Sequence, residues 1–126
     1  MSKVDLMQNQ QYIFGSVLVV ANLMDTLLER ALREYGITAK QWFLLVVIDG
    51  TFDSAPTITE VARKMGSSRQ NVKQLALKLQ QRGMLILEKD KKDSRATRLE
   101  LTDQSHEFNQ FIQPKANSFT QDLFGG

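Results

Sequence analysis

The sequence contains no cysteine and a single histidine among its 126 residues. Without cysteine the chain has no disulfide, no thiolate metal ligand and no thiol redox switch, as is usual in a reducing compartment. With His106 as its only histidine, it can form neither a multi-histidine zinc site nor a dyad of histidine with a cysteine nucleophile. We therefore expect no metal, no cofactor and no enzymatic activity.

Long apolar runs and phosphate-binding glycine loops are also missing. The longest apolar run, "WFLLVVI" at residues 42–48, is far too short to cross a bilayer, and the N-terminus lacks the basic and apolar regions of a signal peptide. The glycines are scattered between helices and loops instead of being grouped in a phosphate-binding motif. These absences predict a soluble, cytoplasmic protein with no membrane partner.

Positive charge is concentrated in one part of the chain. Residues 63–98 contain 11 lysines and arginines against 3 acids, a net charge of +8, whereas the remainder carries −6. A basic segment is typical of a surface that binds a polyanion, because neutralising phosphates releases condensed counterions. A charged face that is merely solvated explains the charge alone equally well.

Apolar residues recur at helical spacing in the first half of the chain. They predict a long amphipathic helix over residues 8–35, ended by Gly36, with more apolar surface than the core of one small domain requires. The excess favours a partner helix. The sequence "TAKQ" at 38–41 predicts the start of a second helix that runs through Ile48, and residues 49–56 are predicted as a loop.

Two more helices are predicted downstream. The sequence "TITE" at 57–60 has the form of a capping box, so it begins a short helix that ends before Gly66. Ser68, or alternatively Ser67, is the expected N-cap of the next helix. Four apolar residues at helical spacing form the buried stripe of that helix: Val72, Leu75, Ala76 and Leu79.

The opposite face of this helix is polar and basic. Arginine and lysine side chains recognise guanine, and asparagine and glutamine recognise adenine. The residues that we expect at a DNA interface on this helix are Ser67, Ser68, Arg69, Gln70, Asn71, Lys73 and Gln74.

After Gly83 the apolar spacing changes from helical to alternating. The segments "MLILEKD" and "ATRLELT" bracket "KKDSR", which predicts a β-hairpin with a charged tip. A short helix, a polar-faced second helix and a basic hairpin form a winged helix-turn-helix, so the fold class is mainly α with one small hairpin. In this motif the second helix lies in the major groove and the wing contacts an adjacent minor groove or phosphates. The predicted partner is therefore double-stranded DNA.

The segments "ITEVARKMG", "SSRQNVKQLALKLQQRGML" and "EKDKKDSRATRLELT" resemble the MarR family of transcription regulators in order and spacing. The resemblance is strongest over residues 57–102. It implies a regulator, most often a repressor, that binds a pseudo-palindromic operator as a homodimer. It also implies that Asp93 braces Arg95 for insertion into the minor groove. The wing residues expected at the DNA are Lys91, Lys92, Asp93 and Arg95.

The resemblance also gives the organisation of the single domain, residues 1–126. The DNA-binding lobe is expected at 37–102 and the dimerisation helices at 1–36 and 103–126, the last of which is shorter than is usual in the family. A small aromatic or phenolic effector that binds between the helical body and the lobes and releases DNA is a further implication. The expected dimer interface comprises Ile13, Val17, Phe108, Phe111, Ile112, Phe119 and Leu123.

Two other functions stay open at this point. The first is a non-specific architectural DNA binder, which would have similar affinity for any duplex, whereas base readout predicts a specificity ratio of roughly 10³ or more. The second is a winged-helix module that binds a protein partner through its long hydrophobic helices. The basic charge of the lobe and the polar residues at 69–74 argue against this module, because protein binding does not require them.

Overall fold

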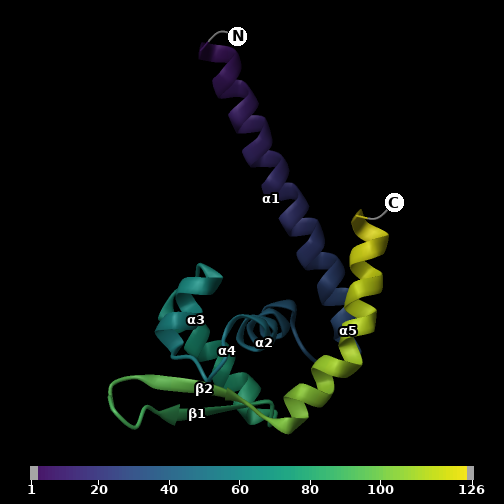
Figure 1. The fold of residues 1–126 in the computed structure, drawn as a ribbon. Helices are drawn as coiled ribbons and strands as arrows, with labels where there is room; N and C mark the ends of the chain where they lie inside the picture. Colours follow the sequence, from purple (N-terminus) through teal and green to yellow (C-terminus); the bar gives the residue numbers. More distant parts are fainter. Residues whose placement is uncertain (1–2, 125–126) are drawn as a thin grey trace. The chain divides into compact units, whose positions relative to one another are not determined.

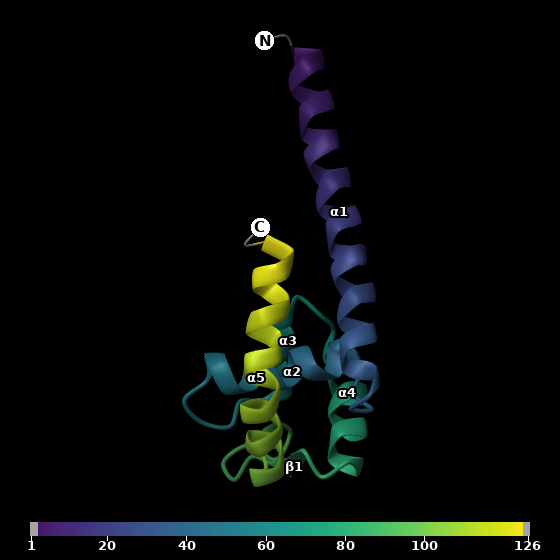
Figure 2. The ribbon, with the colours of Figure 1, turned by 90° about the vertical axis from the view of Figure 1, so that its right-hand side faces the viewer.

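The computed structural model describes residues 3–124, with side chains described at 8–115, 117, 118 and 121 (Figures 1 and 2). The chain folds into two compact units that divide between Ala39 and Lys40. The predicted fold class, mainly helical with one small hairpin, is confirmed. In chain order the elements are α1 (Lys3–Arg33), α2 (Ala39–Thr51), α3 (Ile58–Met65), α4 (Arg69–Gln81), β1 (Leu85–Lys89), β2 (Thr97–Leu101) and α5 (Asp103–Phe124).

The first unit consists of α1 and the turn that follows it. Figure 2 shows α1 as one unbroken helix, which begins earlier and ends two residues sooner than the predicted 8–35. The end is set by Gly36, whose positive φ of 70° an L side chain rarely adopts. The amide of Gly36 donates to the carbonyl of Arg33 at 3.0 Å, a three-residue spacing that closes the helix as a turn.

The second unit has its core between α2, α3, α4 and the hairpin. Helix α2 extends through Thr51, so the prediction of a loop from residue 49 was wrong for its first three residues. Gly50 costs about 1 kcal/mol of helix propensity, which the burial of neighbouring Val47 and Ile48 outweighs. The fully buried apolar side chains of this unit include Leu44, Leu45, Val61, Val72, Leu79, Leu85 and Leu99.

Helix α3 begins at the capping box that its sequence predicts. The amide of Glu60 donates to Thr57 Oγ1 at 3.2 Å, and the amide of Thr57 donates to Glu60 Oε1 at 3.0 Å. Two backbone donors at the helix start are thereby satisfied reciprocally. At the other end Gly66 is left-handed, with φ of 66°, and turns the chain towards α4.

The hairpin pairs β1 and β2 in antiparallel register, as predicted. The apolar residues lie opposite one another in two pairs, Leu85 with Leu101 and Leu87 with Leu99. The hairpin is also attached to the segment before α3, because the amide of Leu99 donates to the carbonyl of Pro56 at 2.8 Å. An isolated bridge between Thr57 and Arg98 extends this attachment. The wing is therefore held by the same short segment that begins α3.

Helix α5 follows directly from β2. Thr102 Oγ1 donates to the carbonyl of Gly83 at 2.7 Å and accepts the amide of Ser105 at 3.2 Å. Gln104 Nε2 donates to the carbonyl of Arg82 at 3.2 Å. These bonds join the end of α4 to the start of α5. Further along, α5 changes direction (Figure 1), and Pro114 inside the helix accounts for the bend.

Candidate nucleic-acid interface

The first turn of α4 is organised by serine side chains. Ser68 is the N-cap, as predicted, and its Oγ accepts the amide of Asn71 at 3.0 Å. The side-chain amide of Asn71 donates to Ser67 Oγ at 2.8 Å. These three residues therefore shape the helix start, where unpaired backbone amides need acceptors.

The rest of the helix separates an apolar face from a polar one. Val72, Ala76 and Leu79 are fully buried, and Leu75, also predicted to be buried, is half-buried. The other four residues predicted to face DNA are all exposed: Arg69, Gln70, Lys73 and Gln74.

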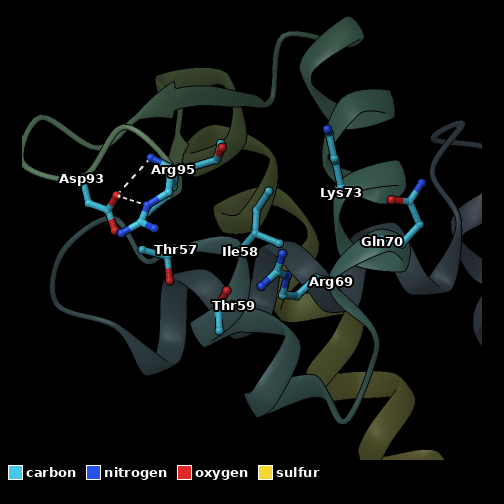
Figure 3. A pocket seen from close by; sticks show the side chains of 10 residues that line it. Thr57, Ile58, Thr59, Arg69, Gln70, Lys73, Asp93 and Arg95 are labelled. Carbon is cyan, nitrogen blue, oxygen red and sulfur yellow. Dashed lines mark hydrogen bonds and ion pairs between the residues drawn. The ribbon is translucent and has the colours of Figure 1, made fainter.

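A groove of about 770 Å³ lies between the start of α3, the polar face of α4 and the wing. Figure 3 shows Arg95 and Asp93 side by side on the wing, Arg69 near the middle of the view, and Lys73 and Gln70 on the far side. Three cations and one acid, Asp93, line the groove, so its charge is positive. The lining residues are Thr57, Ile58, Thr59, Arg69, Gln70, Lys73, Asp93, Arg95, Ala96 and Thr97.

Arg95 is a strongly exposed cation of the wing. Its side chain is 93% exposed, and its Nε lies 3.5 Å from Asp93 Oδ1. The backbone amide of Arg95 donates to the same oxygen at 3.0 Å. Asp93 therefore contacts both the backbone and the side chain of Arg95, the arrangement in which one residue braces the other.

The predicted wing residues divide between the two sides of the hairpin. Asp93 and Arg95 line the groove, whereas Lys91 and Lys92 line a second cleft together with Arg98. Residues of a strand point alternately to opposite faces, and here Thr97 lines the groove while Arg98 lines the second cleft.

The residues that α3 contributes to the groove were not among those predicted from the sequence. Thr57, Ile58 and Thr59 come from the start of α3, where the exposed Thr59 and the end of a helix are able to contact an anion. The capping box at 57–60 was the available signal, because it placed a helix N-terminus next to the predicted recognition helix.

Two carboxylates near the interface have lowered pKa values. The backbone amide of Thr57 is the main cause that lowers the pKa of Glu60. The guanidinium of Arg98 is the main cause that lowers the pKa of Asp90. Both carboxylates are therefore charged at neutral pH and engaged within the protein. Over the part of the chain that the structure describes, no three His, Asp or Glu residues form a group that could hold a metal ion.

The predicted dimer residues differ in accessibility. Ile13, Val17 and Phe111 are 61, 60 and 54% exposed, whereas Phe108 is half-buried. Ile112 is only 5% exposed within its own chain, which leaves little of it for a second copy. The side chains of Phe119 and Leu123 lie outside the described residues.

The exposed apolar surface of α1 is extensive. Eight large apolar side chains between residues 12 and 23 are each more than 45% exposed: Tyr12, Ile13, Phe14, Val17, Leu18, Val19, Val20 and Leu23. By length and composition alone, residues 8–33 would suffice to cross a membrane. The stretch is not an uninterrupted apolar run, which is why its length was not apparent from the apolar runs of the sequence. Polar Asn22 and Asp25 interrupt the stretch.

Part of the chain is similar to a known family. Residues 35–96 match the sequence model of the MarR family. The chain is 25% identical over 95 residues to the transcriptional repressor MprA of Escherichia coli, an alignment that covers 75% of this chain and 54% of that protein. The chain thus spans about half the length of the curated relatives it matches.

Solved structures show the same fold. AbfR of Staphylococcus epidermidis superposes with a TM-score of 0.84 at 19% identity, covering 97% of this chain and 82% of that one. MepR of S. aureus, solved in a complex with DNA, superposes with a TM-score of 0.80 at 17% identity, covering 92% of this chain and 82% of that one.

Proposed function

We propose that this chain is a DNA-binding regulator of transcription of the MarR family, whose sequence model matches residues 35–96 and whose fold it shares. MprA is named as a transcriptional repressor and MepR was crystallised with DNA, and both are similar to this chain. The observation that carries the proposal is the positive groove between α4 and the wing, with the exposed polar face of α4 beside it.

Base recognition is assigned to α4. Arg69, Gln70 and Lys73 project from an exposed face near the start of the helix, the part of a recognition helix that contacts base edges. Lysine and arginine suit guanine, and glutamine suits adenine. Ser67, Ser68 and Asn71 contribute by shaping the helix start, and Gln74 extends the face.

Phosphate contacts are assigned to the groove and the wing. Thr57 and Thr59 line the same groove as Arg95, so that a sugar–phosphate strand in the groove would meet threonine side chains and a guanidinium. Such contacts give affinity and orientation but carry no sequence information. Arg95 itself reaches the minor groove, and Lys91 and Lys92 add positive charge on the other side of the wing.

We further propose that the protein acts as a homodimer and represses transcription in the cytoplasm. The exposed apolar side chains of α1, including Ile13 and Val17, are candidates for burial by a second copy, and the exposed Phe111 of α5 is a separate candidate. Two copies related by a two-fold axis bind a pseudo-palindromic operator whose half-sites lie about 10 bp apart. A repressor of this kind obstructs RNA polymerase.

A small effector that releases DNA is the finer part of the proposal. Among the described residues, buried polar atoms of Trp42, Ser105 and Asn109 have no hydrogen-bond partner. Because buried polar atoms usually have a partner, we propose that a small aromatic or phenolic molecule pairs with one or more of them. Such a molecule releases DNA only by the difference between its affinities for the two conformations.

The test is selection of bound duplexes from a random pool, with the mass of the protein in solution measured at the same concentration. Enrichment of an inverted repeat by a dimer supports the proposal and identifies the operator. Failure to enrich any sequence, with binding that weakens smoothly as salt rises, would assign the protein to the architectural binders.

A further inference from the structure

Arg98 of β2 connects three parts of the winged-helix unit. Its Nε donates to Asp90 Oδ1 at 2.5 Å, and its Nη1 donates to the carbonyl of Ala55 at 2.6 Å. Asp90 begins the wing loop, and Ala55 lies in the segment that leads into α3. The two bonds therefore tie the wing to the rest of the unit through a single guanidinium.

Asp90 in turn organises the wing loop. Its second oxygen, Oδ2, accepts the backbone amides of Lys92 at 3.2 Å and Asp93 at 2.9 Å. The backbone amide of Asp90 donates to the carbonyl of Ala96 at 2.9 Å, which closes the loop. One carboxylate thus uses one oxygen for Arg98 and the other for the loop backbone.

The chain of contacts ends at the wing cation. Asp93, whose amide is held by Asp90, contacts the backbone and the side chain of Arg95. Arg95 is 93% exposed and lies at the groove, whereas Asp90 is only 16% exposed. Arg98 lines the second cleft and is absent from the groove lining. It is therefore placed to orient Arg95 without sharing its surface.

We propose that Arg98 is a positioning residue of the DNA interface, which holds the wing loop through Asp90 and thereby fixes Arg95 at the groove. The inference rests on the proposed DNA-binding function. A pre-oriented Arg95 loses less conformational freedom on binding than a mobile one. Because ordering one long side chain at an interface costs affinity, loss of the brace should weaken operator binding by about 2- to 10-fold.

The brace is tested first without DNA. In the Arg98→Gln variant, the carboxyl carbon of Asp90, followed by NMR against pH, should titrate at a higher pH than in the wild type. The amides of Lys92 and Asp93 should exchange faster with solvent. Lys89→Gln is the matched control, because it removes the same charge from the same cleft and Lys89 is not among the groups that lower the pKa of Asp90. An unchanged titration in Arg98→Gln would overturn the brace.

The action through Arg95 is tested by a double-mutant cycle on operator affinity. Arg98→Gln should weaken binding more than Lys89→Gln does. In an Arg95→Ala background, Arg98→Gln should cost almost nothing further, because the residue that it positions is gone. If the losses of operator affinity in the two single variants add in the double variant, Arg98 acts on DNA independently of Arg95. If Arg95→Ala alone does not reduce operator affinity, Arg95 makes no DNA contact that Arg98 could position. Either result refutes the inference.

Two further variants separate geometry from charge and from misfolding. Arg98→Lys keeps the charge but presents one nitrogen in place of the guanidinium fork, so it should resemble Arg98→Gln. Wild-type operator affinity in Arg98→Lys would show that positive charge at this position is enough, which would refute positioning by the guanidinium. Asp90→Asn breaks the same bond from the other side, which keeps the test valid if Arg98→Gln folds poorly. If the wild type prefers no duplex, the proposed function fails, while the titration and exchange still decide whether the brace exists.

Discussion

Helices α1 and α4 each have a row of exposed side chains, but the exposed side chains of α1 are apolar and those of α4 are polar and basic. α1 exposes valine, isoleucine and phenylalanine, and α4 exposes arginine, glutamine and lysine. Contact between water and an apolar surface of this size is unfavourable, and covering it with another apolar surface lowers the free energy. An exposed basic face is stable in water, and its binding to a polyanion is favourable because condensed counterions are released. The apolar surface of α1 is therefore suited to a protein partner, and the basic face of α4 is suited to a nucleic acid.

The largest effect should come from charging the apolar surface of α1. Val17→Glu places a carboxylate on each side of the proposed two-fold interface, where burial of a valine would contribute about 1.5–3 kcal/mol per copy. The dimer dissociation constant should rise roughly 100-fold or more, because two copies are affected. Sedimentation of a dilution series would measure it. Lys73→Glu is the control, which should abolish operator binding and leave the mass in solution unchanged. A lower mass in Lys73→Glu would mean that α4 also contributes to dimerisation, contrary to the proposed difference between the two helices.

Within α4, the buried face should control stability. Leu79 is fully buried, so Leu79→Ala should reduce the free energy of unfolding by about 2–5 kcal/mol. Urea unfolding of the variant at fixed protein concentration would measure the change. Lys78→Ala, a neighbouring exposed residue, should change stability by less than about 0.5 kcal/mol.

The exposed face of α4 should control sequence preference. Gln70→Ala and Lys73→Ala should each cost about 1–3 kcal/mol of binding to the best operator, and less to operators that lack the matching base. Titration of a panel of single-base operator variants would show which position each residue reads. An equal loss on every duplex would assign the residue to phosphates instead.

The wing should contribute mainly through charge. Arg95→Ala should weaken binding and reduce the slope of log K against log salt by about 0.9, the value for one phosphate contact. Binding measured at several salt concentrations would give the slope. If neither affinity nor slope changes, the wing plays no part in the complex.

The smallest expected effect is the pH dependence that Asp90 contributes. Arg98 lowers the pKa of Asp90 in the folded protein below its ordinary value of 3.8. A lowered folded pKa means that this stabilisation is complete above the unfolded pKa and is lost as pH falls through the folded pKa. Urea midpoints of the wild type and Asp90→Asn should therefore differ at neutral pH and converge on acidification. A difference that stays constant with pH would contradict the charged brace.

Local patterns in the sequence were sufficient for most of the fold. The capping box at Thr57, the N-cap at Ser68 and the alternation of leucines in the hairpin each depend on residues close together in the chain. Such signals are local, so they can be read without knowing what packs against them. The end of α2 could not be predicted in this way, because packing of Val47 and Ile48 outweighs the preference of Asp49 and Gly50 for loops.

The candidate site was predicted in its parts but not in its arrangement. Helical phase placed Arg69, Gln70 and Lys73 on one face, and the resemblance to MarR proteins paired Asp93 with Arg95. Neither source could bring Thr57 and Thr59 to the same groove or put Lys91 and Lys92 on the other side of the wing. Those placements depend on how α3 and the hairpin pack against each other.

The sequence by itself therefore determined the elements, their capping and the polarity of each face, because these follow from short-range hydrogen bonds and from the periodicity of apolar residues. Only the tertiary structure decided that Arg98 connects Ala55, 43 residues earlier in the chain, with Asp90 in the wing. That contact depends on the long-range attachment of β2 to the segment before α3, and no pattern in neighbouring residues encodes it.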